Sequence, residues 1–562
     1  MTSHSNTTLL MSETTVKFAD GKAFNKMFSA GTRWLERAVP EINAINVFPV
    51  PDGDTGTNML LTMRSAVEEA DTLANPNESV GVIARSMAYG ALMGARGNSG
   101  VILSQFWRGF ADGLEGKDTL DGASLALALS NATATAYGGL VHPVEGTILT
   151  VLRTAAEAAT SAAQHEDSNL TDVLECAVQA ARETVASTPE LLPVLKEAGV
   201  VDAGAQGLYV LLDGALSSLN GRDEGPKSIG PDLVAVQIEP LHHSTPTTTQ
   251  VEVPYGYCTN FVLQSKSLDV ERISRKLRNK GQSLVVSANG SSEATVVRVH
   301  LHTFKPGEVI AFAGRMGTLH QIEIHNMDDQ YEEFIRLQRS RTPQVDTAII
   351  TIASGDGLFD VFNSLGATIV VPGGQSMNPS VRQILQAVDL APSDQVILLP
   401  NNKNIILTAG QVESLAEKNV HLVPSRTIPQ GIAALLAFNY DLSAEDNAKA
   451  MTEAVQCVTT IEIARAVRKS EMNGTKIRKG QFIAIQNDKE LIGAGDELAG
   501  VVLEALDRVG SAEAELVTLY WGAEVDTLTA QSVRDQVHER YGIEVELVNG
   551  GQPHYDFIIS VE

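Results

Sequence analysis

The first 220 residues of this chain have the composition of helices, and a pattern of strands begins only later. Stretches such as residues 123–136 and 149–163 are rich in alanine and contain few clusters of β-branched residues. Alanine has the highest helix propensity of the amino acids, so this part is predicted to be all-helical. Short apolar runs followed by helical segments appear after residue 345, at 347–352, 368–371, 395–399 and 420–423. This alternation predicts a parallel sheet with helices covering it.

The middle of the chain separates these two patterns. Residues 222–250 contain four prolines and end in the polar run Thr-Thr-Thr-Gln, which predicts a linker. The segment that follows mixes strand and helix patterns. We therefore predict a multidomain protein, with an all-α domain at 17–222, a linker at 223–250, an α+β middle domain at 251–335 and an α/β region at 345–562. Within the last region, helices are predicted at 444–470 and 498–508.

Composition excludes several classes of function. The chain has 42 Lys and Arg against 68 Asp and Glu, a net charge of −26. Such a surface repels phosphate backbones and anionic lipids, so general binding of nucleic acid or membranes is not expected. Three scattered cysteines are too few for a disulfide framework and fit a reducing compartment. Without an apolar run of membrane length or a signal-peptide pattern, we expect a cytoplasmic protein with no integral membrane segment.

Two carboxylates in a turn mark the first candidate site. Asp52 and Asp54 stand two residues apart in a segment rich in glycine and proline, and a helix is predicted from about Asn58. Carboxylate oxygens suit Mg²⁺, glycines let a phosphate approach the backbone, and a helix start offers free N–H groups. The segment alone is equally compatible with an ordinary Pro-Asp-Gly turn.

A second glycine-rich segment, residues 94–100, opens another predicted helix. Its glycines offer backbone N–H groups, while Asn98 and Ser99 offer side-chain donors, so it too could hold an anion. The alternative is close packing at a helix–helix junction. A Walker A loop is missing, because Gly21-Lys22 and Gly116-Lys117 are not followed by Ser or Thr. If the chain transfers phosphoryl groups, it belongs to an unusual class.

These segments together resemble a known family. Residues 46–59 (Asn-Val-Phe-Pro-Val-Pro-Asp-Gly-Asp-Thr-Gly-Thr-Asn-Met) and 94–105 resemble the signature of the nucleotide-binding L-subunit family of dihydroxyacetone kinases. Residues 142–149 and 199–207 agree with it. The first segment is most similar to the ATP-binding subunit of bacterial fatty acid kinase, and the resemblance extends over roughly residues 20–562.

The resemblance implies an antiparallel helical barrel that binds Mg²⁺ and ATP at one end. It assigns Asp52 and Asp54 to catalysis as Mg²⁺ ligands, and Asn46 lies near the place of a further carboxylate in dihydroxyacetone kinases. Because this chain has asparagine rather than a carboxylate there, the identity of the first metal ligand stays open. The remaining nucleotide-binding positions are Thr55, Gly56, Thr57 and Asn58 in the first turn, Gly97, Asn98 and Ser99 in the second loop, and Thr147 and Asp202, which help close the site.

The implied reaction is transfer of phosphate to a fatty acid. The family's fatty acid is carried by a separate fatty-acid-binding protein of the DegV type, and the product is an acyl phosphate. A carboxylate with a pKa of about 4–5 is already an anion near neutral pH and needs no general base. A homodimer is also implied. The alternatives are a kinase for another small molecule, such as a dihydroxyacetone-like triose, and a nucleotide-responsive binding scaffold.

The middle and C-terminal parts carry weaker signals. Cys258, His300 and His302 fall in strand-like runs and would form a usable Zn²⁺ set if the strands adjoin, although ordinary strand residues explain them too. The resemblance implies a structural or dimer-supporting zinc there. It also implies a DegV-like C-terminal region that docks the fatty-acid-binding protein. Lys403 and Arg426, in loops after predicted strands, are candidates for recognising an acidic ligand or partner.

Overall fold

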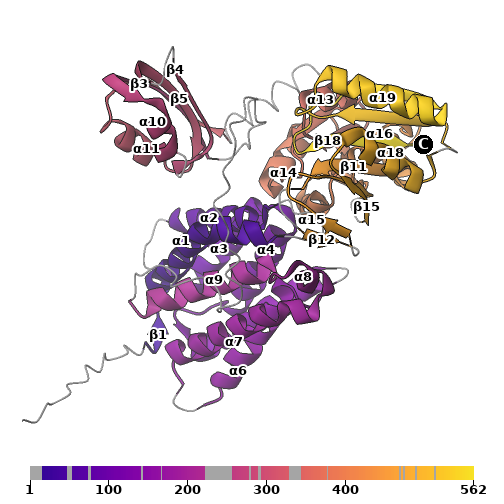
Figure 1. Ribbon diagram of the computed structural model, residues 1–562. Coiled ribbons are helices and arrows are strands. Elements are labelled where there is room, and N and C mark those ends of the chain that lie inside the picture. The colour runs from indigo at the N-terminus through magenta and orange to yellow at the C-terminus, as the bar shows by residue number, and fades with distance from the viewer. Residues whose placement is uncertain are drawn as a thin grey trace, which may run out of the picture.

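The computed structural model has three parts, which Figure 1 shows as a helical domain, a small middle domain and a C-terminal α/β region. It describes residues 16–46, 53–73, 78–140, 143–165, 168–221, 256–277, 280–288, 293–327, 344–375, 378–466, 470–472, 475–487, 490–511 and 514–562. The predicted linker at 223–250 lies outside the described residues. Among the described helices, none is both long and apolar enough to cross a membrane.

The helices of the first part form a closed ring. Each helix from α1 to α7 packs against the next, and α9 packs against both α7 and α1, so the predicted helical barrel is confirmed. Short strands β1 (Phe18–Ala19) and β2 (Leu120–Asp121) pair beside it. The helices are α1 (Gly21–Ile45), α2 (Thr55–Asp71), α3 (Val80–Gly94), α4 (Gly97–Gly113), α5 (Gly122–Gly138), α6 (Ile148–Ala162), α7 (Leu170–Leu191), α8 (Pro193–Ala198) and α9 (Ala203–Leu219).

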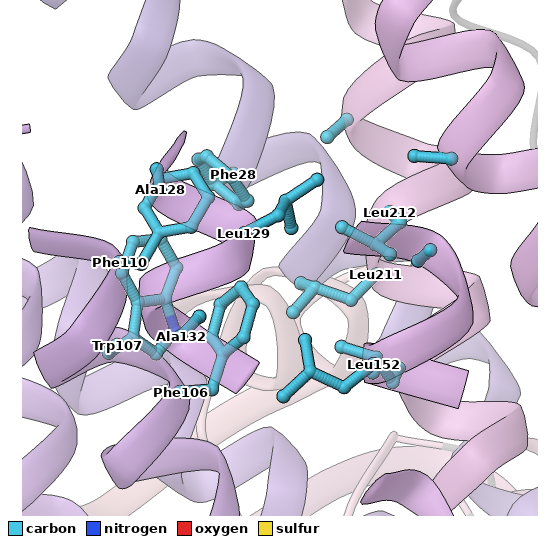
Figure 2. Close-up of a cluster of buried hydrophobic side chains, with 14 of the residues drawn as sticks. Phe28, Phe106, Trp107, Phe110, Ala128, Leu129, Ala132, Leu152, Leu211 and Leu212 are labelled. Carbon is cyan, nitrogen blue, oxygen red and sulfur yellow. The ribbon is translucent and has the colours of Figure 1, made fainter. Parts of the chain in front are cut away.

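Aromatic side chains fill one side of the barrel core, and leucines and alanines fill the rest (Figure 2). Trp107 packs edge-to-face on Phe28 with ring centroids 4.7 Å apart, and its indole N–H donates to the Met63 sulfur at 3.0 Å. Three residues after Phe28, Gly31 of α1 lies so close to the Leu211 carbonyl of α9 that a Cβ would clash. Close packing of these helices closes the ring and fixes the positions of their ends.

The middle domain is a four-stranded antiparallel sheet, in the order β4-β5-β3-β6. Two helices follow its first and third strands and cover a small core of leucine, valine and phenylalanine. The elements are β3 (Tyr257–Asp269), α10 (Val270–Leu277), β4 (Gln282–Ala288), β5 (Glu293–Thr303), α11 (Pro306–Ala313) and β6 (Thr318–Asn326). The predicted α+β class is confirmed.

The C-terminal region begins with the predicted parallel sheet, in the order β10-β9-β7-β8. Its strands are buried on both faces by helices, which explains their nearly continuous apolar sequences. The elements are β7 (Ala348–Ala353), α13 (Asp356–Ser364), β8 (Ile369–Pro372), α14 (Val381–Leu390), β9 (Gln395–Leu399), α15 (Lys403–Leu415), β10 (Asn419–Leu422), α16 (Ile428–Leu436) and α17 (Ala444–Val455).

A second sheet follows in the order β15-β14-β11-β18-β16-β17, in which only β16 and β17 pair in parallel. The helix predicted at 444–470 is wrong in its second half: α17 ends at Val455, and β11 begins at Thr459. The elements from here on are β11 (Thr459–Arg465), β12 (Ser470–Met472), β13 (Thr475–Ile477), β14 (Phe482–Gln486), β15 (Glu490–Gly495), α18 (Leu498–Arg508), β16 (Leu516–Trp521), α19 (Thr527–Tyr541), β17 (Glu544–Asn549) and β18 (Tyr555–Val561). Of these, β12 and β13 pair with each other in a separate two-stranded sheet.

The helical domain and the parallel sheet share a core. Ala95, just after the end of α3, and Val101, in the first turns of α4, belong to the same buried cluster as Ile350 of β7 and Val381 of α14. Helix α15 packs on α4, and α14 packs on α3. The carboxyl edge of the sheet therefore lies against the second glycine-rich segment.

Candidate nucleotide site

A cavity of about 710 Å³ lies between the helical domain and the C-terminal region. Its wall combines apolar side chains such as Ile102, Leu149 and Leu407 with a cluster of polar groups. An apolar part beside a polar part matches a nucleotide, which has a flat base at one end and charged phosphates at the other.

Five described helices begin at this cavity. Helices α2, α4, α6 and α9 belong to the barrel, and α15 belongs to the C-terminal region. In a ring of antiparallel helices every second helix starts at the same end, which explains the convergence of the first four. Each helix start has N–H groups without partners inside the helix and a partial positive charge. Together they create a strong site for an anion, although the protein as a whole is acidic.

Asp54 lies at the start of α2, but its carboxylate does not cap that helix. Instead Asn43, near the C-terminal end of α1, accepts hydrogen bonds from the N–H groups of Gly56 at 2.8 Å and Thr57 at 3.3 Å. The Asn43 amide also donates to the Thr57 hydroxyl at 3.0 Å. Because Asn43 does the capping, the Asp54 carboxylate, 8% exposed, can serve the cavity that it lines.

The second glycine-rich segment is packed directly against the first. Gly97 has a φ of +56°, and a Cβ there would lie 2.7 Å from the side-chain nitrogen of Asn58. Both observations require glycine. Since Asn58 and Ser99 line the cavity together, the close approach at Gly97 brings the starts of α2 and α4 to one place.

Asp202 and Thr147 cap the helices on the opposite wall. The Asp202 carboxylate accepts a hydrogen bond from the Ala205 N–H at 2.7 Å, and the Thr147 hydroxyl accepts one from the Leu149 N–H at 3.4 Å. Burial raises the pKa of Asp202 to about 6, although hydrogen bonds from the backbone of Ala205, Ile148 and Gly204 lower it. Ionisation of the Asp202 carboxyl is therefore less favourable in the folded protein than in an exposed aspartate.

The C-terminal region contributes directly to the polar end. The Asn378 amide donates to Oδ2 of Asp54 at 2.6 Å, and the Asn98 amide donates to the Asn404 side-chain oxygen at 3.2 Å. Lys403 and Arg426 also line the cavity. The loops after β8, β9 and β10 and the start of α15 supply these four residues, which places them at the carboxyl edge of the sheet, where ligands of such sheets bind.

Comparison with known proteins identifies the family. Family models match three successive parts of the chain: a DAK2 domain at 49–217, a FakA-like middle domain of fatty acid kinase at 254–334, and a FakA-like C-terminal domain of fatty acid kinase at 348–562. Protein YloV of Bacillus subtilis (strain 168) is 37% identical over 560 residues, covering 97% of this chain and 100% of that protein. The chain belongs to the FakA-like family of fatty acid kinase subunits.

Solved structures resemble separate parts of this FakA-like protein. A DegV family protein of Corynebacterium glutamicum, Cg2579, is 12% identical, with a TM-score of 0.32, covering 39% of this chain and 97% of that chain. The dihydroxyacetone kinase of C. freundii in complex with AMP-PNP and Mg²⁺ is 19% identical, with a TM-score of 0.28, covering 39% of this chain and 37% of that chain.

Most of the residues predicted for nucleotide binding in this FakA-like protein lie at the cavity. Gly56, Thr57 and Gly97 belong to the same loops, but they shape the backbone rather than line the wall. Asp52 lies outside the described residues, so its predicted role as a Mg²⁺ ligand stays a prediction. The predicted residues that line the cavity are Asn46, Asp54, Thr55, Asn58, Asn98, Ser99, Thr147 and Asp202.

The predicted zinc site gains no support. The register of β3 with β5 places Cys258 directly opposite His302, and His300 opposite Asn260, so Cys258 and His302 are cross-strand neighbours. The side chain of His300 is outside the described set. Among the side chains that the structure does describe, no group of three His, Cys, Asp or Glu is arranged to hold a metal.

Sequence reasoning missed Asn43, Asn378 and Asn404. Asn43 stands only three residues before the first signature segment, so its nearness was a usable signal. Asn378 and Asn404 are more than 300 residues from their partners Asp54 and Asn98, and no local pattern links them.

Proposed function

We propose that this protein is an ATP-dependent phosphotransferase that phosphorylates a fatty acid presented by a separate DegV-type fatty-acid-binding protein. The observation that carries the proposal is the convergence of five helix starts on a cavity that has an apolar part and a buried carboxylate. Membership in the FakA-like family suggests the acceptor class.

The residues at the polar end fit Mg²⁺ and nucleotide phosphates. Asp54 supplies carboxylate oxygens, the ligand type that Mg²⁺ prefers, and Asn43 rather than Asp54 caps helix α2. When bound, Mg²⁺ neutralises charge on the β- and γ-phosphates. The N–H groups at the start of α4, which has no side-chain cap, would hold the phosphate oxygens, with Asn58, Asn98 and Ser99 adding side-chain contacts.

The proposed reaction balances without a proton. A carboxylate oxygen of the fatty acid forms a bond to the γ-phosphorus of ATP, the bond from that phosphorus to the β–γ bridging oxygen breaks, and ADP leaves. Because the acceptor is already ionised near neutral pH, the protein only has to align the groups and screen their charges.

The zinc ion and the homodimer stay predictions.

The test measures acyl-phosphate formation by the full-length chain. The reaction contains Mg²⁺, ATP and a fatty-acid-binding protein loaded with fatty acid, and the product is trapped with hydroxylamine. We expect product only with the loaded protein, and at least about a hundredfold less with Asp54→Asn, because the metal loses a charged ligand. The matched control, Asp112→Asn, changes an exposed carboxylate on α4 and should retain full activity.

Other outcomes would point to the alternatives. Phosphorylation of dihydroxyacetone, with none of the fatty acid, would assign a triose kinase. Tight binding of Mg·ATP with no transfer to either acceptor would assign a nucleotide-responsive scaffold.

A further inference from the structure

The positive side chains around the cavity come from one part of the protein. Among the described residues that line it, Lys403 and Arg426 are the cations, and both belong to the C-terminal region. The barrel supplies helix starts, two aspartates and neutral side chains to the same wall. Since ATP carries a charge close to −4 at neutral pH and Mg²⁺ offsets only two of these, a site for it needs further positive charge.

Lys403 lies at the polar end of the cavity. It is the first residue of α15, and its neighbour Asn404 accepts the hydrogen bond from Asn98 at the start of α4. Arg426 follows β10, the strand beside β9 in the parallel sheet. Both side chains are half-buried and line the same cavity as Ser99 and Asp54, where the helix starts converge.

The contact between the two regions is a packed interface. The guanidinium of Arg96, 7% exposed, donates to the Gln383 side chain at 2.9 Å and to the Asn378 carbonyl at 3.2 Å. Gln383 in turn belongs to the capping box of α14. Buried apolar residues from both regions surround these bonds. The same interface holds Asn378, 4% exposed, whose amide donates to Asp54.

We propose that the C-terminal region completes the nucleotide site within the same chain. Lys403 and Arg426 bind the β- and γ-phosphates, and Asn378 is a positioning residue that orients Asp54 toward the metal. This inference rests on the proposed function, because it takes the ligand of the cavity to be a nucleoside triphosphate. It assigns to the C-terminal region a role in nucleotide binding besides the predicted docking of a partner.

The first experiment compares nucleotides that differ in phosphate number. Binding of AMP, ADP and AMP-PNP with Mg²⁺ is measured by calorimetry on the full-length wild type, Lys403→Ala and Arg426→Ala. A lost charge-assisted hydrogen bond predicts at least about a tenfold loss for AMP-PNP, a smaller loss for ADP and little change for AMP. Lys449→Ala, the matched control, removes an exposed lysine that pairs with Glu445 on α17 and should change none of the three affinities.

The second experiment tests the positioning role of Asn378. In Asn378→Ala, the Mg²⁺ concentration that gives half-maximal AMP-PNP binding should rise severalfold, while ADP binding without Mg²⁺ stays at the wild-type value. A purely structural role would weaken both equally, and that result would overturn the assignment.

The outcomes separate this inference from the proposed function. A graded loss with phosphate number supports the inference even if no acyl phosphate forms, since binding is measured without an acceptor. Equal losses for AMP and AMP-PNP, or wild-type affinity for all three, would overturn it. Normal nucleotide binding with impaired acyl transfer would assign the two cations to partner docking and would also overturn it.

Discussion

The carboxylate of Asp202, a half-buried residue that lines the cavity, makes the stability of the helical domain depend on pH in a specific way. It caps α9, and burial raises its pKa to about 6 from an ordinary value of 3.8. Asp202→Asn removes the charge but keeps an oxygen that can accept the same hydrogen bond, and Asn and Asp are equally good N-cap residues. We predict that this substitution stabilises the domain at neutral pH.

The magnitude follows from the two pKa values. The difference between 3.8 and about 6 corresponds to about 3 kcal/mol, at about 1.4 kcal/mol per pH unit. Because the folded state holds the proton more tightly, the wild type loses this stability as the pH rises from about 4 to about 6. The variant does not titrate. Its advantage should therefore be close to zero at about pH 4 and reach about 3 kcal/mol at about pH 7.5.

Tryptophan fluorescence during urea unfolding can follow this domain alone. Trp34 and Trp107 are buried in its core, and the remaining tryptophan, Trp521, is removed in a Trp521→Phe background. Asp20→Asn, which changes the exposed N-cap aspartate of α1, is the matched control. An advantage of Asp202→Asn that stays constant or shrinks between about pH 4 and about pH 7.5 would refute the argument from charge burial.

Three further substitutions test the geometry of the barrel and its site. Gly97→Ala places an alanine in the left-handed backbone region, which costs about 1–2 kcal/mol, and brings its Cβ against Asn58. Calorimetry should show at least about tenfold weaker binding of Mg·AMP-PNP, and an unchanged affinity would contradict the close approach of Gly97 and Asn58. Asn43→Ala removes the cap of α2 and should cost about 1 kcal/mol in urea unfolding, whereas Asn43→Asp, which keeps an acceptor oxygen, should cost less. Gly31→Ala should lower the unfolding free energy by about 1–3 kcal/mol because α1 must move away from α9; an unchanged urea midpoint would show that this contact yields easily.

The local sequence predicted helices and strands well where the residues of the element itself decide its structure. The run at 395–399 became β9, and the alanine-rich stretch at 149–163 became α6, shifted by one residue. The predicted helix at 444–470 failed at its second half. There Thr459, Thr460, Ile461 and Ile463 are β-branched, and they pair with β14 and β18 in the second sheet. Partner strands from distant sequence overrode the helix-forming residues around them.

The sequence by itself determined the two glycine-rich turns of the site. Positive φ at Gly53 and Gly97, and the helix starts at Thr55 and at Gly97 itself, depend on residues within a few positions, so a local pattern encodes them. Only the tertiary structure decided that five helix starts share one cavity. That follows from closure of the ring and from packing of the parallel sheet on α4. Asn378 beside Asp54, across 324 residues, is a product of that packing, which no short-range pattern specifies.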